Sequence, residues 1–326
     1  MRMRLKQYIS IFIALATAIQ SGSAWSQQAG TIKLLVGFPA GGAPDFVARQ
    51  FAEALHQVAP GYTVVVENRS GASGKLAVDG VLANAADGLT AMVMPSSALI
   101  LVPLVVKSAT YDIERDFVAL GNLAEYGFGI AAGPASDSKQ ITSFLQWAKA
   151  QPAKANYATP GLGTPQHFLG AELEKTSGVE LTHVPYRGGA TALADLLGGQ
   201  VSALITTEPL LVPHHTQRKL RTLMVTSTER NAKMPDVPTV REAGFPKLEA
   251  QDWFGLFVKP SVSADKMNEW RQLIAKVIAL PSYRRAVTDQ GYTLPKATDQ
   301  TLEKRLSIER EAWTQRVRLS GFKSTD

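Results

Sequence analysis

The stretch Leu34-Leu35-Val36-Gly37-Phe38-Pro39-Ala40-Gly41-Gly42-Ala43-Pro44-Asp45 reads as a buried strand, a short glycine-rich loop and a helix opened by proline. Proline suits the first turn of a helix, because its missing N–H would have no partner there. Glycine lets the backbone approach a ligand closely, and a helix N-terminus presents unpaired N–H groups with a partial positive charge. We therefore predict an anion-binding loop whose contact residues are Phe38, Pro39, Ala40, Gly41 and Gly42.

The same arrangement returns at Ala155-Asn156-Tyr157-Ala158-Thr159-Pro160-Gly161-Leu162-Gly163-Thr164-Pro165-Gln166. A short strand is again followed by glycines and by a helix that starts at proline. The candidate contact residues of this second loop are Thr159, Gly161, Gly163 and Thr164. Two such loops in two different lobes predict a protein that holds an anion between them.

Strands and amphipathic helices alternate along the chain, as in an α/β sheet with right-handed crossovers. About 300 residues exceed what one hydrophobic core usually supports, which predicts two domains. Ser263 is expected to cap a helix that runs to Leu280, and Gly321 to end a last helix that begins near Thr301. The predicted strands span residues 31–36, 63–67, 90–94, 155–158, 182–185, 203–206 and 222–226; the other predicted helices span 44–58, 75–86, 143–150, 165–176 and 191–197.

An internal similarity predicts the domain boundaries. Phe128-Gly129 and Phe254-Gly255 each lie in an apolar stretch and are each followed, after four more residues, by proline. We interpret residues 127–132 and 253–258 as two strands that cross between the lobes, although chance similarity is an open alternative. The first lobe would then comprise residues 27–128 and 254–326, and the second lobe residues 129–253. Ligand sites favour such an interdomain cleft and the carboxyl ends of strands.

Several other residues have both a binding and a structural interpretation. Ser96 and Ser97 follow a predicted strand at the expected cleft. Asp45 and Thr164 could contact a ligand, or act only as helix-dipole partner and N-cap. His167 is a candidate contact or a packing residue. Phe38 and Trp253 could form pocket walls or core, and Arg187 could assist as a charge or be a surface residue.

The N-terminus is predicted to be a cleavable export signal over residues 1–26. Arg2, Arg4 and Lys6 precede an apolar run from Tyr8 to Ile19, which is shorter than the ~20 residues of a membrane span. Removing these three basic residues from 34 leaves 31 against 28 acidic residues, a formal charge of +3. Because the charges are interspersed, nucleic-acid binding is not expected. The absence of cysteine excludes disulfides and thiolate chemistry.

Six motifs in register then resemble one family, the Bug receptors, which are periplasmic solute-binding proteins of tripartite tricarboxylate transporters. They are Phe38-Pro39-Ala40-Gly41-Gly42 with Asp45, Glu67-Asn68-Arg69, Tyr111-Asp112, Val184-Pro185-Tyr186, Pro235-Asp236-Val237-Pro238-Thr239-Val240 and Glu242-Ala243-Gly244. The resemblance implies a two-lobed, type II periplasmic binding fold that closes like a Venus flytrap. It also implies a carboxylate ligand, held by backbone N–H groups at the two loops and delivered to a membrane permease.

The chain departs from the family pattern after Gln200-Val201. Where the family often has Phe-Asp-Asn, this chain has Ile205-Thr206-Thr207, and Glu208 lies close by. Thr206 and Thr207 are candidate contacts, and the missing acid leaves the ligand open: a di- or tricarboxylate or an aromatic carboxylate. We expect a monomer without cofactor or metal. A sensor for a signalling partner and, more remotely, a carboxylate-processing enzyme are the alternatives; the five histidines make no recognised metal spacing, and no G-x-S-x-G elbow appears.

Overall fold

The computed structural model describes residues 30–295 and 301–324, so the predicted signal peptide lies outside the described residues. The strands are β1 (Gly30–Val36), β2 (Tyr62–Asn68), β3 (Thr90–Pro95), β4 (Val118–Ala132), β5 (Asn156–Thr159), β6 (Thr182–Pro185), β7 (Ala203–Thr207), β8 (Arg221–Val225) and β9 (Gln251–Val258). The α-helices are α2 (Ala43–Val58), α3 (Lys75–Ala83), α4 (Ser96–Val105), α5 (Ile113–Asp116), α6 (Ile141–Ala150), α7 (Pro165–Ser177), α8 (Gly189–Leu197), α9 (Glu208–Thr216), α10 (Ala264–Ala279), α11 (Pro281–Asp289) and α12 (Leu302–Ser320).

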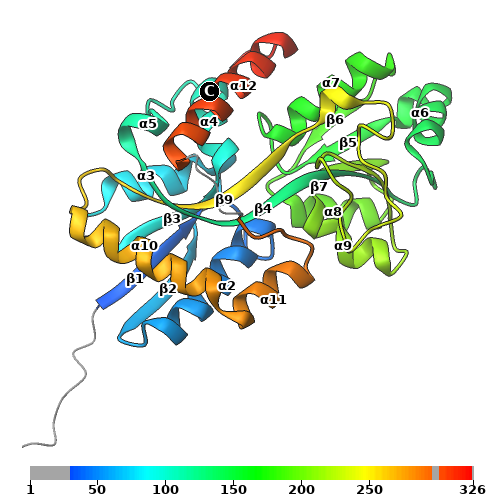
Figure 1. Ribbon diagram of the computed structural model, residues 1–326. Helices are drawn as coiled ribbons and strands as arrows, with labels where there is room; N and C mark the ends of the chain where they lie inside the picture. The colour runs from blue at the N-terminus through cyan, green and yellow to red at the C-terminus, as the bar shows by residue number, and fades with distance from the viewer. Residues whose placement is uncertain (1–29, 296–300, 325–326) are drawn as a thin grey trace, which may run out of the picture.

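The strands form one continuous hydrogen-bonded system in the order β2-β1-β3-β9-β4-β7-β5-β6, with β8 pairing to β4. β1 pairs in parallel with β2 and β3, and β5 pairs in parallel with β6 and β7. We call the part built on β1, β2 and β3 the first lobe, and the part built on β5, β6, β7 and β8 the second lobe. Each parallel group carries its own helices, as Figure 1 shows. The predicted α/β fold of two lobes is therefore present.

β4 and β9 join the lobes. Residues 118–127 of β4 pair with β9, whereas residues 128–132 pair with β7 and β8. Thr226 ties the two crossing points together: its hydroxyl accepts the Phe128 N–H at 2.8 Å and donates to the Ala250 carbonyl at 2.6 Å. In Figure 1 both strands run between the two groups of helices. The domain boundaries themselves stay a prediction.

The helices cover the sheet with apolar faces. α2 and α10 pack on the first lobe through Phe51 and Trp270, which are fully buried in the largest core cluster. α12 packs on the opposite side against α4, through Leu306 and Trp313. After α12, Phe322 reaches the second lobe and contacts Phe168 of α7 edge to face, with ring centroids 5.6 Å apart. The C-terminal helix therefore contacts both lobes.

Four α-helices among the described residues were not predicted from the sequence, including the one-turn helix α5. α4 is apolar on all sides and contains Pro103, so it shows no helical period. α9 contains Pro213, and α11 is short and rich in charged and polar residues. β4 also begins nine residues before the predicted crossing strand, and α3 ends at Ala83 rather than at residue 86. Burial on all sides in α4 and an internal proline in α9 remove the pattern that identifies a helix.

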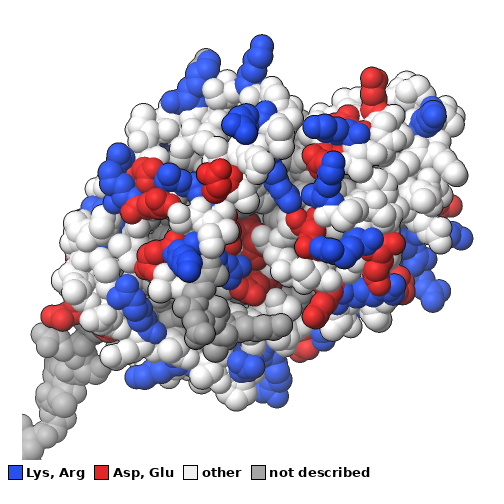
Figure 2. Space-filling view, turned by 45° about the horizontal axis from the view of Figure 1, so that its top comes forward, with Lys and Arg blue, Asp and Glu red and all other residues white. Residues whose placement is uncertain are grey.

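The surface carries charges of both signs. On the face shown in Figure 2, Lys and Arg side chains lie interspersed with Asp and Glu. Among the residues that the structure describes, no helix combines the length and the apolar character needed to cross a membrane.

We predict that Phe51→Ala lowers the free energy of unfolding by about 3–5 kcal/mol, because it leaves a cavity between α2 and the sheet. Urea denaturation followed by circular dichroism measures this loss. Leu319→Ala, at a side chain that is 59% exposed on α12, is the control and should change stability by less than about 0.5 kcal/mol. Similar losses in both variants would contradict the core that we describe.

Candidate functional site

The main cleft lies between the two lobes, at the carboxyl ends of parallel strands, and encloses about 780 Å³ including the solvent at its mouth. Residues after β1, β3, β5, β6 and β7 line it, so five strand ends and the helices that follow them converge on one space. Most of the lining is apolar: Phe38, Leu101, Val102, Phe128 and Phe254 form its walls. Polar recognition must therefore come from a few groups.

The structure brings together nine of the fifteen residues predicted as contacts. The nine that line the cleft are Phe38, Pro39, Ala40, Gly42, Ser97, Gly163, Thr164, Thr206 and Thr207. The six that do not are Gly41, Asp45, Ser96, Thr159, Gly161 and His167. Three of these six support the second loop. The Thr159 hydroxyl donates to the Gly161 carbonyl, which also accepts the hydroxyl of the lining residue Thr164. His167 Nδ1 accepts the Gly163 N–H at 3.3 Å.

Asp45 occupies the N-terminus of α2. Its carboxylate accepts the Gly41 N–H at 2.9 Å and hydrogen bonds from Asn68 and Arg49. Burial would raise the pKa of Asp45, but these hydrogen bonds outweigh it and hold the pKa below the usual value. The first loop therefore already contains an ionised carboxylate, which belongs to the protein itself.

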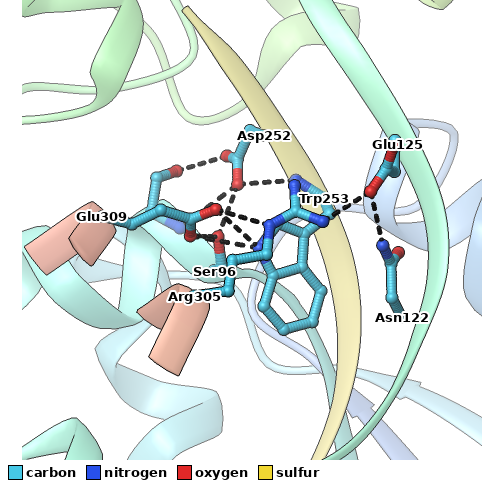
Figure 3. Close-up of polar contacts among 8 residues, drawn as sticks. Ser96, Asn122, Glu125, Asp252, Trp253, Arg305 and Glu309 are labelled. Atoms are coloured by element: carbon cyan, nitrogen blue, oxygen red, sulfur yellow. Dashed lines mark hydrogen bonds and ion pairs between the residues drawn. The ribbon is translucent and has the colours of Figure 1, made fainter. Parts of the chain in front are cut away.

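Asp252 occupies the N-terminus of α4 in the same way, and the sequence analysis missed it. Its carboxylate lines the cleft and accepts the Ser97 N–H at 3.3 Å together with the Ser97, Ser96 and Tyr126 hydroxyls. Figure 3 shows Ser96 between Asp252 and Glu309 of α12. Because side chains alternate along a strand, Asp252 and Phe254 face the cleft while Trp253 is buried in the core behind it. The same alternation could have identified Asp252 in the sequence.

Glu309 and Arg305 support this wall from α12. Trp253 Nε1 lies 3.1 Å from both Glu309 oxygens, and Arg305 pairs with Glu309 at 2.8 Å and with Glu125. Burial, together with the nearby negative charge of Asp252, raises the pKa of Glu309. Figure 3 shows the carboxyl groups of Glu309 and Glu125 on either side of Arg305.

The second lobe presents helix N-termini that carry no such carboxylate. α7 starts after Thr164 and α8 after Gly188, and neither has an acidic residue in its first turn or a side-chain cap. α9 starts with Glu208, but this buried carboxylate accepts from Ser227 and Asn231 instead. Burial raises the pKa of Glu208 despite these hydrogen bonds. No carboxylate therefore competes for the N–H groups at the starts of α7 and α8. At α7, Pro165 has no N–H and the His167 N–H donates to the Thr164 carbonyl at 3.0 Å.

Polar side chains that can still donate hydrogen bonds line the cleft on the same lobe. Thr207 Oγ1 is buried and has no hydrogen-bond partner among the described residues, although Thr207 lines the cleft and is only 6% exposed. Gln166, in the first turn of α7, also lines the cleft with no side-chain bond there, and Arg187 adds an exposed guanidinium. Gln166 was not singled out from the sequence, because an amide at a helix start has no distinctive signal.

The two lobes touch at the cleft mouth. The Ser73 hydroxyl donates to the Leu162 carbonyl at 2.8 Å, from one lobe to the other. Gly188, at φ +120°, brings its backbone so close to Pro39 that a Cβ there would lie 3.0 Å from the proline ring. No group of three His, Asp or Glu side chains in residues 30–295 and 301–324 could hold a metal ion.

Two histidines lie behind the second loop. The rings of His167 and His183 stack with centroids 4.1 Å apart, and His183 Nε2 lies 2.7 Å from the Thr159 hydroxyl. Burial lowers the pKa of His183 to about 3, with a further contribution from His167. The pair is therefore neutral near pH 7 and supports the loop rather than supplying a charge.

Comparisons with known proteins identify relatives across the whole chain. The family described as tripartite tricarboxylate transporter family receptor matches residues 47–318. Protein BugT of Bordetella pertussis is 31% identical over 321 residues, which cover 98% of each chain. A protein encoded in the tcbD-tcbE intergenic region of Pseudomonas sp. is 32% identical over 283 residues, 86% of this chain and 84% of its own.

Solved structures agree with the fold. The periplasmic binding protein BugD superposes with a TM-score of 0.85 at 26% identity, over 91% of this chain and 99% of its own. An R. palustris protein solved with adipate gives 0.85 at 25% identity, over 91% and 99%. MatC of Rhodopseudomonas palustris, solved with malate, gives 0.81 at 26% identity, over 89% and 99%. The predicted two-lobed fold of the periplasmic binding proteins is confirmed.

We predict that His183→Gln makes the protein less sensitive to acid. Because the pKa of His183 in the folded state lies below the usual histidine value of 6.5, the stability that neutral His183 provides is present above pH 6.5 and is lost as the pH falls toward about 3. The urea midpoint of the wild type should drop more between pH 7 and pH 5 than that of the variant. His56→Gln, at an exposed position on α2, should keep the wild-type pH dependence. Equal curves for wild type and His183→Gln would contradict the assignment.

Proposed function

This chain belongs to the tripartite tricarboxylate transporter receptor family, and from that premise we propose that it captures a small organic carboxylate in its cleft and delivers it to a membrane permease. Its family is one of periplasmic solute-binding receptors, so it has a periplasmic solute-binding role. The ligand, the binding residues and the permease are the parts that we propose.

The observation that carries the proposal is the set of helix N-termini at the cleft. α7 and α8 offer backbone N–H groups with no acidic residue in their first turns, and Thr207 adds an unpartnered hydroxyl. Such groups bind anions without an arginine clamp. Two structural relatives, one solved with adipate and one with malate, add support, since both ligands are carboxylates.

The energies are sufficient for a transport receptor. A partly buried helix N-terminus contributes up to ~2 kcal/mol, and each charge-assisted hydrogen bond contributes ~1.5–3 kcal/mol. Several such contacts, after the cost of association, reach the ~8 kcal/mol of a micromolar complex.

For the site we propose direct contacts from the nine predicted residues that line the cleft, with Gln166 added. Thr159, Gly161 and His167 would hold the second loop in place, and Asp45 the first. We further propose that the lobes close around the ligand by a hinge where β4 changes partners, between Gly127 and Phe128. The contact between Ser73 and Leu162 supports a closed arrangement in the present structure.

For the partners we propose a monomeric receptor that meets the permease subunits of a tripartite transporter. Deleting the gene separates transport from sensing: loss of carboxylate uptake with intact induction supports transport. Loss of induction with intact uptake would instead support a sensor.

We predict that a carboxylate raises the melting temperature of the mature protein. Ligand at 100 times its Kd stabilises the folded state by about 2.7 kcal/mol, which should shift the transition by at least about 3 °C. A thermal-shift screen of mono-, di-, tricarboxylates and aromatic carboxylates measures this, with the corresponding amides and alcohols as uncharged controls. Stabilisation by the controls alone, or by sugars and amines alone, would refute a carboxylate receptor.

We predict that Arg187→Gln weakens binding of the carboxylate found in that screen by no more than about fivefold. The guanidinium is exposed, and exposed ion pairs contribute about 0–1 kcal/mol. Isothermal titration calorimetry gives the ratio of the two Kd values. A loss of more than about a hundredfold would mean that this arginine, rather than the helix N-termini, holds the anion.

A further inference from the structure

The two sides of the cleft offer different groups to an anion: carboxylates on the first lobe and hydrogen-bond donors on the second. We propose that the ligand carries a single carboxylate at one end and an apolar body at the other. The carboxylate would bind to the second lobe and the apolar body to the first. This inference rests on the proposed function, because it names the class of carboxylate that the same cleft would take.

The helix starts of the first lobe already carry carboxylates: Asp45 lies in the first turn of α2 and Asp252 lies at the start of α4. Asp45 accepts the Gly41 N–H at α2, and Asp252 accepts the Ser97 N–H at α4. Five donors lie within hydrogen-bond distance of the Asp252 carboxylate, one of which, the Ser96 hydroxyl, is shared with Glu309. These donors fill the roughly four lone-pair sites of a carboxylate. It therefore has no free acceptor for a ligand ammonium, and it leaves no free donor of Ser97 or Tyr126 for a ligand carboxylate.

The wall behind Asp252 adds negative charge. Glu309 shares the Ser96 hydroxyl with Asp252, at 2.8 Å from each, and Glu125 lies on the other side of Arg305. Figure 3 shows these three carboxyl groups with one guanidinium among the labelled residues. A second ligand carboxylate placed against this wall would meet like charge in a poorly hydrated space.

The second lobe offers the opposite environment. α7 and α8 begin without acidic residues in their first turns, and the Thr207 hydroxyl at the start of α9 has no partner although it is more than nine-tenths buried. Thr207 lines the cleft, as do Gln166 and Arg187. Each of these side chains can donate a hydrogen bond, and a carboxylate accepts from all three types.

The rest of the cleft lining on the first lobe is apolar. Phe38, Ala98, Leu101, Val102 and Phe254 line the cleft on that lobe, with the Phe128 ring at the crossing strand. Burying a ligand's aromatic ring or alkyl chain against them is favourable by roughly 25 cal/mol per Å², whereas a second carboxylate there would lose its hydration without gaining donors.

The test compares acids of one skeleton that differ by one carboxylate: benzoate with terephthalate, and hexanoate with adipate. Calorimetry on the full mature protein should give a Kd at least about tenfold lower for the monocarboxylate of whichever pair binds. Equal or tighter binding of the dicarboxylate in that pair overturns the inference while leaving a carboxylate receptor intact. Binding of no carboxylate at all overturns the inference and the proposed function together.

Two variants test the two sides separately. Thr207→Val keeps the side-chain shape and should raise the Kd of the monocarboxylate about tenfold, because it removes the unpartnered hydroxyl. Asp252→Asn removes the charge on the first lobe and should reduce the preference over the dicarboxylate at least about threefold. Glu208→Gln is the control for Asp252→Asn, since Glu208 is also buried but faces Ser227 and Asn231.

The controls decide how the variants are interpreted. Glu208→Gln should leave the preference unchanged, and circular dichroism should show that each variant is folded. If Asp252→Asn does not fold, the ratio of the two Kd values in the wild type and the Thr207→Val loss still decide the proposal. An unchanged Kd in Thr207→Val, or a preference that survives Asp252→Asn in full, would overturn it.

Discussion

The antiparallel pairing of β4 with β9 is the constraint on which the rest of this structure depends. β4 pairs with β9 through residue 127 and with β7 and β8 from residue 128, so one strand belongs to both lobes. Thr226 fixes the second crossing to the first through hydrogen bonds to Phe128 and Ala250. The two connections run side by side, and residues at the carboxyl ends of the parallel strands of both lobes line one cleft.

The cleft obtains its chemistry from the helices that start there. Among the described residues, five helices begin at or beside it, and the protein's own carboxylates accept backbone N–H groups at two of these starts, those of α2 and α4. The open N-termini all belong to the second lobe. A fold that repeats the same strand–loop–helix unit can therefore make chemically different sides from it, since a single acid at a helix start reverses the local field.

The C-terminal helix α12 supports the cleft from behind Asp252. Glu309 and Arg305 contact the residues behind the cleft, and Phe322 packs on the second lobe next to His167. α12 thus contacts the first lobe by its length and the second by its end.

Much of the fold followed from local patterns. Alternating strands and helices, the caps at Ser263 and Gly321, and the two glycine–proline loops appear where they were predicted. These features depend on residues within a few positions of one another. α4 and α9 were missed because uniform burial or an internal proline hides the helical period.

The sequence alone determined that this chain has two glycine–proline loops at helix starts, and its motifs matched one family of receptors. Only the tertiary structure decided which loops remain open to a ligand. Asp252 reaches the N-terminus of α4 from 155 residues away, and the buried Thr207 hydroxyl has no hydrogen-bond partner among the described residues. Side-chain direction and long-range contact depend on how whole lobes pack, and no short-range pattern in the sequence encodes them.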